Sequence, residues 1–146
     1  MRGGRIAIAV VAVALLGLVD AGGALACSCL RSTPAESLAR SDAAIVGRLL
    51  AVEPRGAGQA VYRYRVLRVF RGARQIERGS SLAVHGNRGG AACGLPERTG
   101  ARLGLFLERA RGRWSGSLCG TVSPRRLREA AQGTRAAASA DPDCAG

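Results

Sequence analysis

Five cysteines and a single histidine are the residues of this chain best suited to covalent or metal chemistry: Cys27, Cys29, Cys93, Cys119, Cys144 and His85. A catalytic cysteine needs a free thiol beside its base, and structural zinc sites favour cysteines separated by roughly two to four residues. The single-residue gap in Cys27-Ser28-Cys29 is too short for that zinc pattern. His85 has no partner motif, and we expect it in a loop at a strand end. We therefore expect two disulfides, one remaining cysteine, no intrinsic metal or cofactor, and no enzymatic activity.

The residues before Cys27 have the pattern of a secretory signal peptide. Arg2 and Arg5 precede an apolar block at 6–19, and Ala24-Leu25-Ala26 follows. The block is shorter than the roughly 20 residues that a membrane-spanning helix needs. We predict cleavage between Ala26 and Cys27, which sends the protein to an oxidising compartment. Lipoprotein processing at Cys27 is the alternative, and Ala24 is a poor residue for that signal.

Removal of residues 1–26 leaves a chain of a size that suits one domain. It carries 20 arginines, no lysine, 9 acidic residues and a net charge of +11. Such a charge suits an anionic partner such as a glycan, a cell-wall polymer or an acidic protein surface. The arginines form no long basic run of the kind typical of nucleic-acid tails. We expect mostly scattered, solvated arginines on an exported monomer that contacts neither nucleic acid nor, after cleavage, the membrane.

Short strands dominate the rest of the chain, and two helices flank them. Thr33, Pro34 and Glu36 form a capping signal for a helix that ends near Arg40. Ser123-Pro124 begins a second helix, to about Ala131, and the composition of 133–146 predicts a mobile tail. Strands are expected at 43–52, 61–69, 81–84, 102–108 and 114–122.

The second of these strands contains an irregularity. Apolar and arginine residues alternate from Val61 until the alternation slips at Val66 or Leu67. A slip of one residue exchanges the two faces of a strand, so we predict a β-bulge there. Gly86 to Gly94 follows no phosphate-loop pattern and is expected to be a mobile loop.

Five short strands with small terminal helices and no repeats favour a closed or nearly closed barrel over residues 27–132. At this size the five-stranded OB-fold is the leading candidate. Composition alone does not separate it from a small sandwich.

The segment CSCLRSTPAESLARSDAAIVGRLLAV, beginning at Cys27, resembles the mature amino terminus of the tissue inhibitors of metalloproteinases, a netrin-like OB-fold family. The family positions fall on Cys27, Ser28, Cys29, Pro34, Leu38 and Asp42. AACGLP around Cys93 and Leu-Cys-Gly at 118–120 stand where the family has two further cysteines. The resemblance covers about residues 27–124 and implies a bacterial-type single inhibitory domain.

The resemblance implies disulfides from Cys27 to Cys93 and from Cys29 to Cys119. A third family bridge lacks its first cysteine, because Ala39 stands at that position. Cys144 lies about where the second would be, so a free thiol or an intermolecular disulfide is expected there.

In the resembled inhibitors, the amino group and carbonyl oxygen of the first cysteine chelate the catalytic zinc of a target metalloproteinase. The resemblance gives that role to Cys27, directs the Ser28 side chain into the target's specificity pocket, and places Ala92, Cys93 and Gly94 alongside as further contacts.

A binding module of another class is the alternative. OB-folds often bind oligonucleotides or sugars on the barrel face. Four aromatic residues near arginines could supply stacking: Tyr62, Tyr64, Phe70 and Trp114. Against it, Tyr62 and Tyr64 lie on the face expected to be buried, which favours the inhibitor-like hypothesis.

Overall fold

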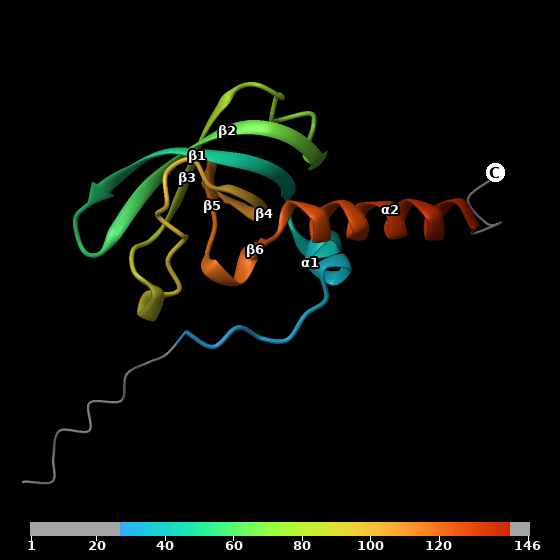
Figure 1. The fold of residues 1–146 in the computed structure, drawn as a ribbon, viewed down its shortest axis with the longest axis horizontal. Helices are drawn as coiled ribbons and strands as arrows, with labels where there is room; N and C mark the ends of the chain where they lie inside the picture. Colours follow the sequence, from blue (N-terminus) through green and yellow to red (C-terminus); the bar gives the residue numbers. More distant parts are fainter. Residues whose placement is uncertain (1–26, 141–146) are drawn as a thin grey trace, which may run out of the picture.

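The computed structural model describes residues 27–140, so the predicted signal peptide and Cys144 lie outside the described residues (Figure 1). The elements in chain order are α1 (Pro34–Arg40), β1 (Ala43–Arg55), β2 (Gln59–Arg71), β3 (Ser81–Asn87), the short 3-10 helix η1 (Gly90–Ala92), β4 (Arg102–Ala110), β5 (Arg113–Ser115), the short 3-10 helix η2 (Leu118–Gly120), β6 (Thr121–Val122) and α2 (Pro124–Ala140). Within this range, no helix is both long and apolar enough to cross a bilayer.

The sheet closes on itself as a five-stranded OB-fold barrel, as predicted. Its strands are hydrogen-bonded in the order β1-β2-β3-β5-β4, and β4 returns to pair with β1. Of the strand pairs in residues 27–140, only β3–β5 is parallel, with Val84 opposite Trp114. Ile45 of β1 faces Val69 on one side and Leu105 on the other, which shows how one strand joins both halves of the barrel.

Bulges give β1 and β2 the curvature that closure needs. The partners of Val46 and Gly47 are Arg68 and Val66, so Leu67 is left unpaired, and the predicted bulge is confirmed. Two further register shifts, between Ala44 and Ile45 and between Leu49 and Ala51, occur in the same pair. Because each bulge increases the local twist, the two long strands can coil around a small core.

Two hydrophobic clusters hold the fold. The first fills the barrel with fully buried side chains that include Ile45, Leu49 and Leu105. The second lies outside, where α1 and α2 cover β1 and β4 through Leu38, Phe106 and Leu127 among others. This helical layer depends on Gly104, because a Cβ there would lie 2.9 Å from Val122 Cγ2 and 3.1 Å from Leu127 Cβ.

The α1 prediction is confirmed in detail. Thr33 Oγ1 accepts a hydrogen bond from the Glu36 backbone at 3.2 Å, and the Glu36 carboxylate accepts one from the Thr33 N–H at 2.7 Å. This capping box satisfies two donors at the first turn. Residues 27–32 lead into the helix at this capped end.

The predicted fifth strand, 114–122, is wrong as one continuous element. β5 ends at Ser115, and Gly116 turns the chain by donating its N–H to the His85 carbonyl at 3.0 Å. η2 follows, and β6 pairs with β4 only at Thr121 and Val122. A Cβ on Gly116 would lie 3.2 Å from Val84 and 3.3 Å from Leu107. Gly116 thus packs closely against the barrel, and η2, which carries Cys119, separates β5 from β6.

The predicted end of the second helix is also wrong. α2 continues through Gly133 to Ala140, so 133–140 is helical where a mobile tail was expected. Alanine has the strongest helix propensity, and four alanines after Gly133 offset the cost of that glycine. Figure 1 shows this half of α2 extending away from the barrel.

Two tyrosines of β2 have identical burial and different hydrogen bonding. Tyr62 and Tyr64 are both fully buried in the barrel. The Tyr62 hydroxyl donates to the Asn87 carbonyl at 2.8 Å, whereas the Tyr64 hydroxyl has no hydrogen-bond partner in the described part of the chain. Burial raises the pKa of the Tyr64 phenol, so its hydroxyl stays neutral and carries the cost of an unmade hydrogen bond.

We predict opposite effects for removing the two hydroxyls. Tyr62→Phe should lower the free energy of unfolding by about 1 kcal/mol, because the Asn87 carbonyl loses its donor. Tyr64→Phe should raise it by up to about 1 kcal/mol, because a buried unpaired hydroxyl is removed. Guanidinium unfolding of both variants measures this. An equal loss in the two would show that the Tyr64 hydroxyl is hydrogen-bonded in solution.

Candidate functional site

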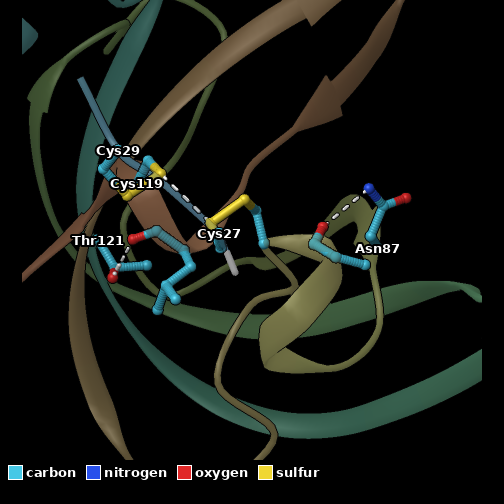
Figure 2. Close-up of a disulfide and its surroundings, with 8 residues drawn as sticks. Cys27, Cys29, Asn87, Cys119 and Thr121 are labelled. Atoms are coloured by element: carbon cyan, nitrogen blue, oxygen red, sulfur yellow. Dashed lines mark hydrogen bonds between the residues drawn. A yellow bond between two sulfur atoms is a disulfide. The ribbon is translucent and has the colours of Figure 1, made fainter. Parts of the chain in front are cut away.

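The segment from Cys27 to Ser32 runs without regular secondary structure past the loops that follow β3 and β5, and two disulfides pin it there (Figure 2). Cys27 is bonded to Cys93, with Cα atoms 5.2 Å apart, and Cys29 is bonded to Cys119, with Cα atoms 5.3 Å apart. This is the pairing that the family resemblance implied. Because β3 and β5 are parallel, their following loops meet at one end of the barrel, and one short segment reaches both.

The two bridges lie against each other. Cys27 Sγ is 3.8 Å from Cys119 Sγ, and the sulfur atoms of Cys27, Cys93 and Cys119 all lie within 4.8 Å of one another. Three thiolates at such distances could hold a metal ion, but each of these sulfurs is already oxidised in a disulfide. The cluster is therefore a covalent junction of three chain segments.

The loop that carries Cys93 is held from inside the barrel. Tyr62, at the core, donates to the Asn87 carbonyl, and the Asn87 amide donates to the Ala92 carbonyl at 3.1 Å (Figure 2). Cys93 itself has the left-handed backbone conformation, with φ of 55°. Its carbonyl accepts the N–H of Leu118 at 2.8 Å, which joins the two disulfide-bearing loops directly.

An ion pair closes the same loop. The Arg88 guanidinium donates two hydrogen bonds to the Glu97 carboxylate, at 3.1 and 3.0 Å. These bonds lower the pKa of Glu97, since they stabilise its ionised form. Burial, followed by the charge of Glu97, raises the pKa of Tyr62 and keeps its phenol a donor. The loop between β3 and β4 is thus an organised support, in contrast to the mobile glycine-rich loop expected from its composition.

The pinned segment presents its backbone outward. Ser28, Cys29 and Leu30 are exposed, and Leu30 retains 94% of its accessible surface. Residues 27–32 make no backbone–backbone hydrogen bond to any other residue in the 27–140 range. Their N–H and C=O groups are therefore available to a partner, as in the recognition of extended peptides.

The neighbouring loop presents its residues to different extents. Ala91 and Ala92 are exposed next to Cys93, which is half-buried. Gly94 is buried, and a Cβ there would lie 2.5 Å from the Asn87 carbonyl oxygen; the target contacts expected of Ala92, Cys93 and Gly94 stay predictions. Glycine is required there for close backbone packing within the loop.

Two hollows flank this region. A cleft of about 670 Å³ follows the segment from Leu30 to Ser32 and is bounded by α1, β4 and η2, with Arg40, Phe106 and Glu108 among its lining residues. A second, of about 520 Å³, lies between Leu118 and the loop of Arg88 to Glu97. Leu118 is 36% exposed. The sequence did not predict that Leu118 is exposed here. It also did not predict the hydrogen-bond network of the loop, because no local pattern marks its members: Tyr62, Asn87, Arg88 and Glu97.

The alternative candidates lie elsewhere or are inaccessible. His85 was expected in a loop, but it lies within β3, half-buried and paired with Val61 and Ser115. Tyr62 and Tyr64 are buried as expected, and Trp114 is 8% exposed. Three of the four aromatic residues considered for stacking are therefore inaccessible, and the fourth, Phe70, is half-buried.

No protein-family model matches this sequence, and no curated protein is significantly similar to it.

We predict that each disulfide contributes strongly to stability. The bridges join residues 66 and 90 positions apart in the sequence, and loops of that size correspond to about 4 kcal/mol each at most. Each bridge is removed by a double variant, Cys27→Ala/Cys93→Ala or Cys29→Ala/Cys119→Ala. Each variant should lower the free energy of unfolding by up to about 4 kcal/mol, which guanidinium unfolding measures. Ser28→Ala, at an exposed position between them, is the control and should have no effect. Double variants as stable as the control would contradict the prediction.

The Arg88–Glu97 pair predicts a pH dependence. Because the pKa of folded Glu97 lies below its ordinary value of 4.5, the stabilisation is present above about pH 4.5 and is lost as pH falls through the lower, folded pKa. Glu97→Gln should therefore lower the thermal midpoint near neutral pH, and the difference from wild type should shrink in acid. Glu77→Gln is the control for the loss of one negative charge, since Glu77 has no ion-pair partner in the described range. A constant difference for Glu97→Gln would contradict this role.

Proposed function

We propose that this protein is an exported inhibitor of a zinc metalloproteinase and that it acts through Cys27 as its mature amino-terminal residue. The observation that carries the proposal is the double pinning of Cys27 and Cys29, which presents an exposed backbone with unused hydrogen-bonding groups. The resemblance of the segment to the tissue inhibitors of metalloproteinases supports the same conclusion.

Export is part of the proposal, because the inhibitory group exists only after cleavage. The pattern of residues 1–26 and the two disulfides both favour an oxidising, extracytoplasmic location. Cleavage after Ala26 converts the Cys27 amide nitrogen into an amine. An amide nitrogen is a poor metal ligand, so retention of even one preceding residue removes the reactive group.

The chemistry needs two ligand atoms from one residue. A free α-amine and the adjacent carbonyl oxygen of Cys27 form a five-membered chelate with the target's zinc and displace the water that the enzyme activates. The thiol takes no part, since it is bonded to Cys93. An α-amine has an ordinary pKa of about 7.7 to 8.0, so loss of its proton costs little near neutral pH.

Rigidity is the second requirement. The disulfides, together with the hydrogen bonds of Asn87 and of Cys93 with Leu118, hold the segment before any partner arrives. A preorganised ligand avoids much of the ordering entropy of binding. In this proposal Ser28 enters the target's specificity pocket, and the exposed Ala92 and the disulfide of Cys93 contact the adjacent surface.

The decisive experiment compares two forms that differ by one residue. One begins at Cys27, and the other carries a single alanine before it. Both are assayed against a panel of secreted zinc metalloproteinases after mass analysis confirms two disulfides. The Cys27 form should inhibit a sensitive member, and the extended form should be weaker by more than about 100-fold, a loss of about 2.8 kcal/mol of binding free energy.

Equal potency of the two forms would exclude chelation by the amine. A lack of inhibition across the panel by a correctly oxidised Cys27 form would contradict the proposed function itself. A serine protease assayed in parallel should be unaffected by both forms, which tests that the effect depends on zinc.

A further inference from the structure

Three arginines from neighbouring strands lie side by side on the outer face of the barrel. In the strand register, Arg48 of β1 is directly opposite Arg65 of β2 and directly opposite Arg102 of β4. Directly opposed residues project from the same face of a sheet, and all three side chains are exposed. We call Arg65, Arg48 and Arg102 the arginine row.

The row carries uncompensated charge. Among residues 27–140, none of its guanidinium groups forms an ion pair with a carboxylate within 4.0 Å. Within the same range, the one hydrogen bond that their side chains make runs from Arg65 to the Gly79 carbonyl at 3.0 Å. Nearby Arg63 differs, because Glu53 neutralises it. Like charges directly opposite one another on adjacent strands destabilise a sheet, so this arrangement carries a repulsive cost that an anionic ligand would relieve.

The surroundings indicate what kind of anion fits. A single-stranded nucleic acid bound through its bases would require exposed aromatic rings, but Tyr62, Tyr64 and Trp114 are buried. Arg68 lies over the Phe70 ring, 5.0 Å from its centre, and covers the remaining candidate. A protein partner would require an apolar centre, and Leu50 is the only exposed large apolar side chain on these strands. Of the three kinds of anionic partner, an acidic polymer that is recognised through its charge fits this surface best.

We infer that the arginine row is a binding site for an acidic polysaccharide that carries one negative group on each sugar. Strands are about 4.8 Å apart, so the three side chains leave the sheet at intervals similar to the length of one sugar ring. Each guanidinium can donate two parallel hydrogen bonds to a carboxylate. The site would hold the exported protein on an anionic matrix, and it is independent of Cys27.

The test uses the mature protein with both disulfides intact and polygalacturonate, which has one carboxylate per sugar. The variant Arg48→Gln/Arg65→Gln/Arg102→Gln removes the row. Arg74→Gln/Arg78→Gln/Arg135→Gln is the control, since it removes the same charge from exposed arginines without ion-pair partners within 27–140. Binding is measured by calorimetry over a fourfold range of salt concentration, with methyl-esterified polygalacturonate as the neutral polymer and oligo-dT as the nucleic acid.

We expect wild type and control to bind polygalacturonate and not its neutral ester. Three neutralised charges that each release about 0.7 of a counterion, as in single-stranded polyanions, correspond to a roughly 20-fold weakening over the fourfold rise in salt. The row variant should lose most of this affinity and this salt dependence, while a cooperative thermal transition in the absence of polymer shows that it is folded. The inference would be overturned if the control were weakened equally, if oligo-dT were preferred, or if wild type did not bind.

Discussion

The junction of two disulfides is the constraint on which the rest of the site depends. Cys27 and Cys119 bring their sulfurs within 3.8 Å, so the amino-terminal segment, the loop after β3 and the turn after β5 share one covalent centre. None of the three has a regular hydrogen-bonded ladder of its own at this point. The disulfides hold these three segments in place, a role that a larger hydrophobic interface would otherwise have. Small domains with limited cores often depend on disulfides in this way.

The barrel serves this junction by keeping β3 and β5 parallel. Their ends then lie together, and the loops that follow them start from fixed positions. The core contributes directly through Tyr62, which is buried along its ring and donates its hydroxyl to Asn87 at the loop. Packing inside the barrel and the geometry of the exposed segment are therefore coupled through one side chain.

Two surfaces of the molecule differ in their charge. Near Cys27 the surface includes exposed apolar side chains, Ala91, Ala92 and Leu118, and Arg88 is paired with Glu97. On β1, β2 and β4 it is strongly basic, because Arg48, Arg65 and Arg102 coincide in register. The proposed contact with a protease and the inferred contact with a polyanion thus use separate surfaces.

Local features were predictable from sequence because their causes are local. The capping residues Thr33 and Glu36 determined the start of α1, and the broken alternation at Leu67 determined a bulge. The pairing of the cysteines was implied only by a family resemblance, since spacing leaves several pairings open. Tertiary structure decided the rest: Gly116 turns out of the sheet over Val84, Gly94 is buried under Asn87, and three distant arginines become neighbours. These outcomes depend on register and on contacts between residues far apart in the chain, which no local pattern encodes.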